Sequence, residues 1–551
     1  MKAAFSHIGP SIFLVLLLGV LCVYPQEPGK PARICFQDVA AQSGLQFVLE
    51  NSPTPEKRLI ETMPGGVAAF DFDGDGRTDI FFTNGAEVPS LQKNSTRYSN
   101  RLFHNEGNLK FRDVTAGSGL SGDGYSMGVA VGDFDNDGKA DIFVAGVQRN
   151  KLYRNMGNGK FEDVTARAGI KSDQWSVAAG WLDFDNDGLL DLFVINYGAW
   201  SVDTNRFCGD SSAGLRVYCH PKYFEPRPNQ LYRNRGDGTF EDVSEKSGIA
   251  KHHGRGMSVS FADYDNDGLL DAFVTKDNHP NFLFHNLGKG HFEEVALLAG
   301  VALLDHGKAV ASMGTDFRDY DNDGLPDIVV TALNGETFPI FHNDGHGSFH
   351  DATYSTHVAK LSASHSGWAA GWYDFNNDGW KDVFSANSHV NDVVEKVEAA
   401  VYKQSNTVFT NLGNGVFTET FCPELEKARK AHRGAAFADL EGDGKIDVVA
   451  SALGEPAELW HNITDHAGHW LNVKLKGTRS NRDGIGASLR IGSQINQMTS
   501  ASGYASSTHA GVHFGLGTQS TVQKLEIFWP SGRRQTLENV KADRVLTVEE
   551  P

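Results

Sequence analysis

The sequence predicts an all-β protein: a seven-bladed β-propeller followed by a small C-terminal all-β domain. Seven acidic loops of the form D-x-[DNE]-x-D-G-x-x-D, each followed by an apolar strand, begin at Asp71, Asp133, Asp183, Asp263, Asp319, Asp374 and Asp439. Their spacing of 50 to 80 residues leaves room for four short strands per repeat, which is the unit of a propeller blade. The 60 glycines among 551 residues fit the many turns that such a fold needs.

The acidic loops have the spacing of calcium sites. Loops of this kind supply carboxylates from positions one, three, five and nine and a backbone carbonyl from position seven, which belongs to Arg77 in the first loop. We expect up to seven structural Ca²⁺ ions, whose side-chain ligands would be Asp71, Asp73, Asp75 and Asp79; Asp133, Asp135, Asp137 and Asp141; Asp183, Asp185, Asp187 and Asp191; Asp263, Asp265, Asp267 and Asp271; Asp319, Asp321, Asp323 and Asp327; Asp374, Asn376, Asp378 and Asp382; and Asp439, Glu441, Asp443 and Asp447. Asn376 keeps an oxygen but loses a charge, which predicts a weaker sixth site, and Glu441 is one methylene longer than aspartate.

Each repeat reads as four strands in a fixed order. A run of small residues such as Gly66-Val67-Ala68-Ala69 precedes the loop, because the innermost strands crowd around a central channel. A wholly apolar strand follows the loop, as expected where neighbouring blades cover both faces. The third strand ends in asparagine, and an F-x-D-V-T strand finishes the unit.

The phase of the repeat predicts how the ring closes. The chain begins with an isolated last strand, Phe36-Gln37-Asp38-Val39, and the seventh repeat lacks one. We therefore expect the N-terminal strand to complete the seventh blade, which removes exposed sheet edges. The propeller would span residues 35–465 and the C-terminal β domain residues 466–551.

Two insertions and four cysteines stand apart from the repeat. Cys208 and Cys219 lie in the long interval after Asp183 and are expected to form a disulfide in an oxidising compartment. Cys35 and Cys422 either pair across the closing blades or stay buried as free thiols. Valines recur at helical spacing within residues 389–402, which predicts a short helix.

The N-terminus reads as a signal peptide over residues 1–24, followed by a linker over residues 25–34. Lys2 precedes an apolar run over residues 12–23, which is short for a membrane span of about 20 residues. The bulky Leu21 argues against lipid attachment at Cys22. These features predict a secreted, extracellular or periplasmic protein with no membrane span in the mature chain.

The net charge of −19 has a local origin. The seven loops hold 27 of the 69 acidic residues, so the acidity reflects ligand chemistry and not a surface for a basic partner. The sequence has no basic nucleic-acid patch, P-loop or Rossmann fingerprint, which excludes those classes of function.

Three short motifs make the C-terminal segment recognisable: Arg482-Asp483-Gly484-Ile485-Gly486-Ala487, His513-Phe514-Gly515-Leu516-Gly517 and Trp529-Pro530-Ser531-Gly532. It resembles an ASPIC/UnbV domain, and the repeats resemble the FG-GAP or VCBS repeats of integrin α-subunit propellers. The combination is similar to the cartilage acidic protein-like family and its bacterial exported members. The resemblance implies an extracellular calcium-binding propeller with a role in adhesion or matrix interaction, and it does not imply a demonstrated catalytic activity.

Two hypotheses of function follow. The favoured one is a non-enzymatic adhesion or interaction module for a protein or glycan ligand, with the C-terminal domain as a spacer or second contact. The alternative is an exported polysaccharide lyase or hydrolase with a site at the channel mouth. Residues that precede innermost strands are the candidate ligand face: His252, His253, His365, His432 and Trp175. The Arg235-Gly236-Asp237 tripeptide is interpreted as a hairpin turn that the repeat generates.

Overall fold

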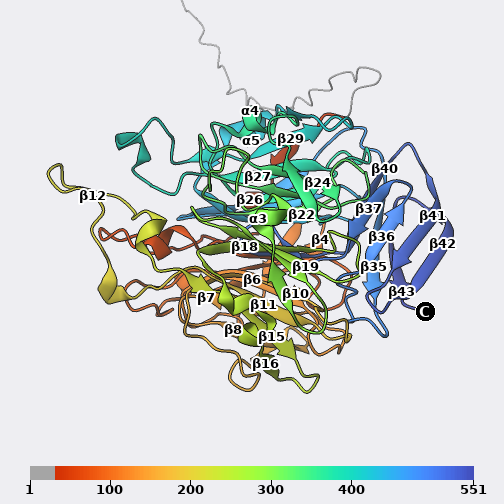
Figure 1. Cartoon of the computed structure of the whole chain (residues 1–551), viewed down its shortest axis with the longest axis horizontal. Coiled ribbons are helices and arrows are strands. Elements are labelled where there is room, and N and C mark those ends of the chain that lie inside the picture. The colour runs from red at the N-terminus through yellow and green to blue at the C-terminus, as the bar shows by residue number, and fades with distance from the viewer. Residues whose placement is uncertain (1–31) are drawn as a thin grey trace, which may run out of the picture.

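The computed structural model describes residues 32–551 (Figure 1). The expected signal peptide and most of the linker lie outside these residues. Within them, seven groups of four antiparallel strands, which we call blades, are arranged in a ring, and a C-terminal β domain packs on one side of it. The predicted all-β fold of repeated units is confirmed. No helix in this described part is long and apolar enough to cross a membrane.

Each blade has four strands, which follow one another from the channel to the rim. Blades 1 and 2 are β2 (Val67–Phe70), β3 (Asp79–Phe82), β4 (Arg101–Gly107) and β5 (Lys110–Asp113); and β6 (Ser126–Gly132), β7 (Asp141–Gly146), β8 (Lys151–Gly157) and β9 (Lys160–Asp163). Blades 3 and 4 are β10 (Ser176–Leu182), β11 (Asp191–Asn196), β15 (Gln230–Asn234) and β16 (Phe240–Asp242); and β18 (Gly256–Ala262), β19 (Asp271–Lys276), β20 (Phe282–Asn286) and β21 (Phe292–Glu294). Blades 5 and 6 are β22 (Thr315–Arg318), β23 (Asp327–Val330), β24 (Ile340–Gly345) and β25 (Ser348–Asp351); and β26 (Gly367–Tyr373), β27 (Asp382–Asn387), β29 (Thr407–Asn411) and β30 (Phe417–Glu419). Blade 7 is β32 (His432–Ala438), β33 (Asp447–Ala452), β34 (Glu455–Asn462) and β1 (Phe36–Asp38).

The ring closes through the N-terminal strand, as the phase of the repeat predicts. β1 pairs antiparallel with β34, with Phe36 opposite Asn462. The innermost strands contact one another in the order β2, β6, β10, β18, β22, β26 and β32, and β32 contacts β2. Small residues are required at these contacts, because a Cβ on Gly314 would lie 2.2 Å from the Trp368 carbonyl oxygen and one on Gly434 would lie 2.1 Å from that of Gly65.

A repeated side-chain hydrogen bond joins neighbouring blades. The asparagine at or near the end of the third strand donates from Nδ2 to a carbonyl of the preceding blade; Asn155 bonds the Phe72 oxygen at 2.8 Å, and Asn105 bonds the Leu440 oxygen at 3.0 Å. The same bond is made by Asn234, Asn286, Asn343, Asn411 and Asn462. Since these amides are buried, the bonds satisfy carbonyls that no strand ladder reaches.

Short elements fill the connections. The α-helices are α1 (Ala40–Ser43), α2 (Ser244–Ser247), α3 (Ala296–Ala299), α4 (Val358–Ser362) and α5 (Pro423–Lys427). The 3₁₀ turns are η1 (Leu59–Thr62), η2 (Thr96–Tyr98), η3 (Val202–Thr204), η4 (Pro221–Tyr223), η5 (Ile249–Lys251) and η6 (Val394–Lys396). Two-residue strand pairs are β12 (Gly209–Asp210) with β13 (Leu215–Arg216), β14 (Arg227–Pro228) with β17 (His253–Gly254), and β28 (Gln404–Ser405) with β31 (Arg429–Lys430). The helix predicted within residues 389–402 is reduced to the single turn η6.

The C-terminal domain contains two sheets. One has the order β40 (Val512–Gly517), β35 (His469–Lys476), β43 (Arg544–Glu549). The other has the order β37 (Gln494–Gln497), β36 (Ser488–Ile491), β41 (Thr521–Phe528), β42 (Arg534–Lys541). A third part, the hairpin β38 (Ala501–Ser502) and β39 (Ser506–His509), leaves the domain and joins the sheet of blade 1, where β39 pairs parallel with β2.

This hairpin occupies the channel of the ring. The backbone of Gly503 exchanges hydrogen bonds with Thr315 of β22, and the Ala505 oxygen accepts from the Val129 nitrogen of β6 at 3.0 Å. Tyr504 is fully buried, and its hydroxyl donates to the Met63 oxygen at 2.8 Å. The C-terminal domain is therefore an integral part of the ring and not only a spacer docked after it.

Candidate functional site

Each acidic loop connects an innermost strand to the second strand of its blade, and the first aspartate organises it. In the first loop, Asp71 Oδ1 accepts from the Gly74 nitrogen and Oδ2 from the Gly76 nitrogen, both at 2.8 Å. Gly74 and Gly76 have φ of 76° and 91°, which glycine adopts without steric cost. The loop is thus curled so that its alternate side chains converge.

The last aspartate of the loop is buried at the start of the second strand. Asp79 Oδ2 accepts from the Phe72 nitrogen at 3.1 Å and Oδ1 from the Asn105 nitrogen at 2.7 Å. The ligand atoms of Asp71, Asp73 and Asp79 all lie within 4.8 Å of one another. An all-oxygen cluster of this kind suits a hard divalent cation.

Burial and mutual repulsion make these carboxylates costly to ionise in the absence of a cation. Burial, with Asp73 and Asp71 adding to it, raises the pKa of Asp79 to about 8. Burial likewise raises the pKa values of Asp133 and Asp183 to about 7, and neighbouring carboxylates add to the shift. A bound cation would remove this penalty by favouring the charged forms.

A basic side chain lies beside most loops, which the sequence pattern of the loops did not predict. The residue before the blade-joining asparagine lies against the loop carboxylates: His104 Nε2 is 3.2 Å from both Asp73 and Asp75, and Arg233 Nε is 2.7 Å from Asp185. Arg154, His285, His342 and His461 occupy equivalent positions. The sequence feature that could have predicted this basic side chain is the recurrent His-Asn or Arg-Asn pair near the end of the third strand.

The sixth loop lacks the basic neighbour that the others have, and the C-terminal domain covers it. Thr410 stands where its neighbours have histidine or arginine, so no basic side chain from the third strand reaches Asp374, Asp378 and Asp382. The C-terminal domain covers this loop, because the Gly468 nitrogen donates to the Asn376 oxygen at 2.9 Å and the Gly517 nitrogen to the Asn377 oxygen at 2.8 Å.

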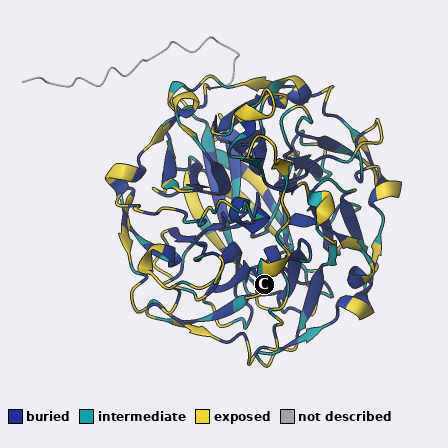
Figure 2. Cartoon of the chain, turned by 90° about the vertical axis from the view of Figure 1, so that its left-hand side faces the viewer, coloured by how far each residue is buried: buried dark blue, intermediate teal, exposed yellow. Residues whose placement is uncertain are grey.

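The C-terminal domain covers other acidic loops as well. The Asp133 nitrogen donates to Asp483 Oδ2 at 2.8 Å, the Arg482 nitrogen donates to Asn136 Oδ1 at 2.8 Å, and His513 Nε2 lies 3.1 Å from the Gly444 oxygen. The acidic-loop face of the ring is therefore largely occupied within the molecule. The opposite face, from which the strand pair β12–β13 projects, is free of this domain (Figure 1). Figure 2 views the ring from that face.

The histidines predicted to gather at the channel mouth do not line the cavity there. That cavity, of about 340 Å³, is lined instead by Met63, Met257, Met313, Trp368, His220 and His389, among other residues. His252 packs against Phe282 and Phe284, His253 is exposed in β17, and His365 is not part of the lining. Trp175 packs against Tyr197 and lines a separate cleft.

His432 has a structural role because a carboxylate from its own blade reaches it. Its Nε2 lies 2.9 Å from Glu458 Oε2 and its Nδ1 lies 3.0 Å from the Asn387 oxygen, and both side chains are fully buried. Although burial opposes ionisation, His432 and Lys430 lower the pKa of Glu458 to about 2. The pair stabilises the innermost strand and is not available to a ligand.

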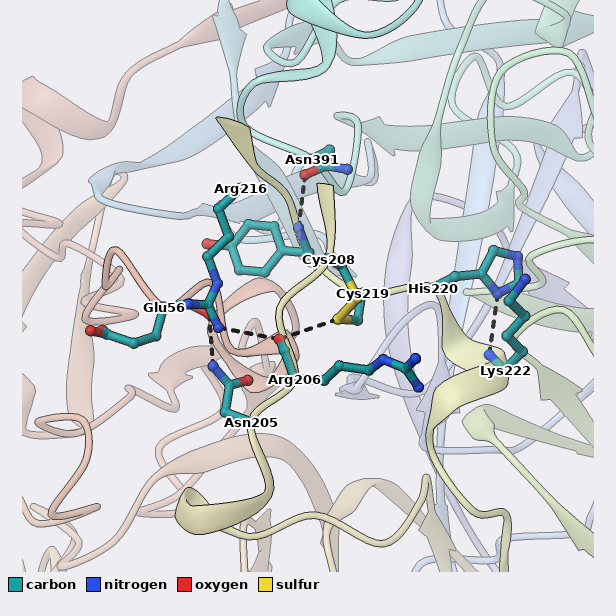
Figure 3. Close-up of a disulfide and its surroundings, with 10 residues drawn as sticks. Glu56, Asn205, Arg206, Cys208, Arg216, Cys219, His220, Lys222 and Asn391 are labelled. Atoms are coloured by element: carbon teal, nitrogen blue, oxygen red, sulfur yellow. Dashed lines mark hydrogen bonds between the residues drawn. A yellow bond between two sulfur atoms is a disulfide. The ribbon is translucent and has the colours of Figure 1, made fainter. Parts of the chain in front are cut away.

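The cysteine predictions have different outcomes. Cys208 and Cys219 form a disulfide with a Cα–Cα distance of 5.3 Å, as predicted (Figure 3). Cys35 and Cys422 are free thiols whose sulfur atoms lie 3.6 Å apart. Arg235-Gly236-Asp237 lies in the turn between β15 and β16, where the Gly236 nitrogen bonds Asn234 Oδ1, so the hairpin-turn interpretation is confirmed.

Comparison with known proteins assigns the family. The FG-GAP-like repeat model matches residues 71–144, 133–194, 222–274, 265–330 and 319–385, which together exceed half of the chain, and the ASPIC and UnbV model matches residues 477–551. Cartilage acidic protein 1 of Mus musculus is 27% identical over 321 residues, covering 56% of this chain and 46% of the relative; that of Homo sapiens is 26% identical over 318 residues, covering 56% and 45%. The chain thus matches less than half the length of these relatives. A solved structure of YCF48 bound to D1 peptide superposes with a TM-score of 0.42 at 8% identity, covering 79% of this chain and 99% of that one. The chain belongs to the FG-GAP-like repeat family and ends in an ASPIC and UnbV domain.

Proposed function

We propose that this protein is an exported, calcium-stabilised β-propeller that acts as a non-enzymatic interaction module for a protein or glycan ligand. The observation that carries the calcium part is the sevenfold repetition of a loop with convergent carboxylates, of which the first is half-buried or buried and the last is buried. Without a cation, ionising these carboxylates costs free energy. Extracellular calcium modules typically bind Ca²⁺ with Kd of about 10⁻⁴ to 10⁻³ M.

The ligand would bind the face opposite the C-terminal domain. The acidic-loop face is occupied by that domain, whereas the opposite face carries the irregular segments that differ between blades. Three of these segments are tied together: the Tyr218 nitrogen donates to Asn391 Oδ1 at 3.2 Å, and Asn205 Nδ2 donates to the Glu56 oxygen at 2.8 Å. Loops held on a rigid scaffold are where recognition is usually placed. The lyase or hydrolase alternative stays an untested prediction.

The test is thermal unfolding in EDTA and across Ca²⁺ and Mg²⁺ titrations. Each site stabilises the folded state by about 2.7 kcal/mol at a hundredfold excess over Kd, so we expect Tm to climb with millimolar Ca²⁺ and not with equal Mg²⁺. Asp79→Asn removes a buried ligand and should reduce the Ca²⁺-dependent rise, whereas Asp237→Asn in the exposed hairpin turn should leave it unchanged. A Tm that ignores Ca²⁺ in the unsubstituted protein would refute the calcium role.

A further inference from the structure

An unusual group of positive charges lies on the disulfide-bearing insertion. Residues 201–228 contain four cations and three carboxylates in a chain whose net charge is −19. Among the described residues, none of the four cations, Arg206, Arg216, Lys222 and Arg227, forms an ion pair with a carboxylate. Many cations elsewhere in this acidic protein do have such partners, as Arg154, Arg233 and Arg318 show. The patch is therefore left to attract an anion.

Aromatic side chains hold these cations in place. The Arg206 guanidinium lies 4.2 Å from the ring centroid of Tyr223, and Lys222 Nζ lies 5.2 Å from the same ring. Arg216 lies 5.3 Å from the ring of Phe207 and donates to the Arg206 carbonyl oxygen at 3.2 Å. Figure 3 shows Arg206, Arg216 and Lys222 around the Cys208–Cys219 bond. The disulfide and the stacking limit the freedom of the loop, which lowers the entropy lost on binding.

The patch borders a cleft with aromatic walls. Arg206, Arg227, Tyr223, Phe224, Trp175 and Trp200 all line a cleft of about 420 Å³. Trp175 lies 6.4 Å from Trp200 and 6.0 Å from Phe224, and the Tyr223 side chain is 45% exposed. Flat exposed aromatic rings stack on the apolar faces of sugar rings, and guanidinium groups bind carboxylates or sulfates through paired hydrogen bonds.

We propose that this cleft binds an acidic polysaccharide, whose carboxylates or sulfates contact Arg206, Lys222 and Arg227 and whose sugar rings pack against the aromatic side chains of Tyr223 and Phe224. An acidic peptide would use the same cations but not the aromatic walls, so the combination favours a glycan. This inference rests on the proposed interaction function and names the class of its ligand.

The experiment measures Kd by calorimetry for the full chain in millimolar Ca²⁺. The probes are a hyaluronan octasaccharide (carboxylate only), a chondroitin sulfate octasaccharide (carboxylate and sulfate), neutral chitohexaose and hexaglutamate. We expect binding to one or both acidic oligosaccharides, weakening as salt rises, with the neutral sugar and the peptide at least about tenfold weaker. The relative affinity of the two acidic probes shows whether carboxylate or sulfate is preferred.

Matched variants assign the site. Arg206→Gln and Tyr223→Ala should each weaken binding about tenfold without changing Tm, because both side chains are exposed. Lys541→Gln, which removes an exposed unpaired cation on the C-terminal domain, should change neither. Equal affinity for hexaglutamate or chitohexaose, no binding of either acidic oligosaccharide, or unchanged binding by both site variants would overturn the proposal. Since Tm reports calcium separately, a failure here is distinct from a failure of the calcium-stabilised fold.

Discussion

The hairpin in the channel predicts that a residue of the C-terminal domain stabilises the whole ring. Tyr504 is 0% exposed, its ring centroid lies 5.0 Å from that of Trp368, and its hydroxyl bonds the Met63 oxygen. Replacing a buried aromatic residue by alanine costs about 3–5 kcal/mol. If residues 32–551 unfold as one unit, their unfolding entropy of about 2.1 cal/mol/K per residue converts this loss into a fall in Tm of about 3–5 °C.

The assay is calorimetric unfolding of Tyr504→Ala, Tyr504→Phe and Tyr354→Ala in saturating Ca²⁺. The phenylalanine variant removes only the hydroxyl and should lose about 1–3 kcal/mol, because the Met63 carbonyl stays buried without that donor. Tyr354 is 73% exposed, so its alanine variant should match the unsubstituted protein. A Tyr504→Ala protein as stable as Tyr354→Ala, or one in which only a separate C-terminal transition moves, would refute the claim that the hairpin ties the domain to the ring.

Two further predictions concern pH and redox state. In EDTA, the free energy of unfolding should fall as pH rises from about 4 to about 8. In the folded state the pKa of Asp79 is about 8, and the pKa values of Asp133 and Asp183 are about 7. These carboxyls therefore hold protons in the folded state that the unfolded chain has already released. Urea unfolding at several pH values measures this slope, which should disappear in saturating Ca²⁺; a slope of opposite sign in EDTA would contradict it. Cys35 and Cys422, with sulfurs 3.6 Å apart, should form a disulfide when oxidised glutathione accepts the two electrons, and this bond should stabilise the ring by about 2–4 kcal/mol. Thiol titration and peptide mass spectrometry check the bond, with Cys422→Ser as the control, and two thiols that remain titratable would count against it.

The acidic loops are the part of the site that a local sequence pattern predicted well. Position along the chain fixes which carboxylates share a loop, since Asp71, Asp73 and Asp79 lie within one short stretch of backbone. The closure of the ring was also predicted correctly from the sequence. The seventh repeat lacked its last strand, and the N-terminal strand belonged to no complete repeat. In both cases the information lies in a short motif repeated many times.

Other parts of the candidate site could not be predicted from sequence patterns. His432 looked like a loop residue at the channel mouth, yet Glu458, 26 positions away, draws it into a buried pair. The short polar segment around Gly503 gave no sign that it fills the channel, because its partners are carbonyls and amides of strands hundreds of residues earlier. Likewise, the spacing of residues in the sequence does not show that Arg206 lacks a carboxylate as an ion-pair partner while Arg233 has one.

The sequence by itself determined the repeating strand order, the closure of the ring and the acidic loops, because these depend on contacts between residues close in the chain or on the repeat itself. Only the tertiary structure decided which face the C-terminal domain covers, what occupies the channel and which charges remain unpaired. These depend on contacts between segments far apart in sequence, for which burial and geometry, and not local spacing, select the partners.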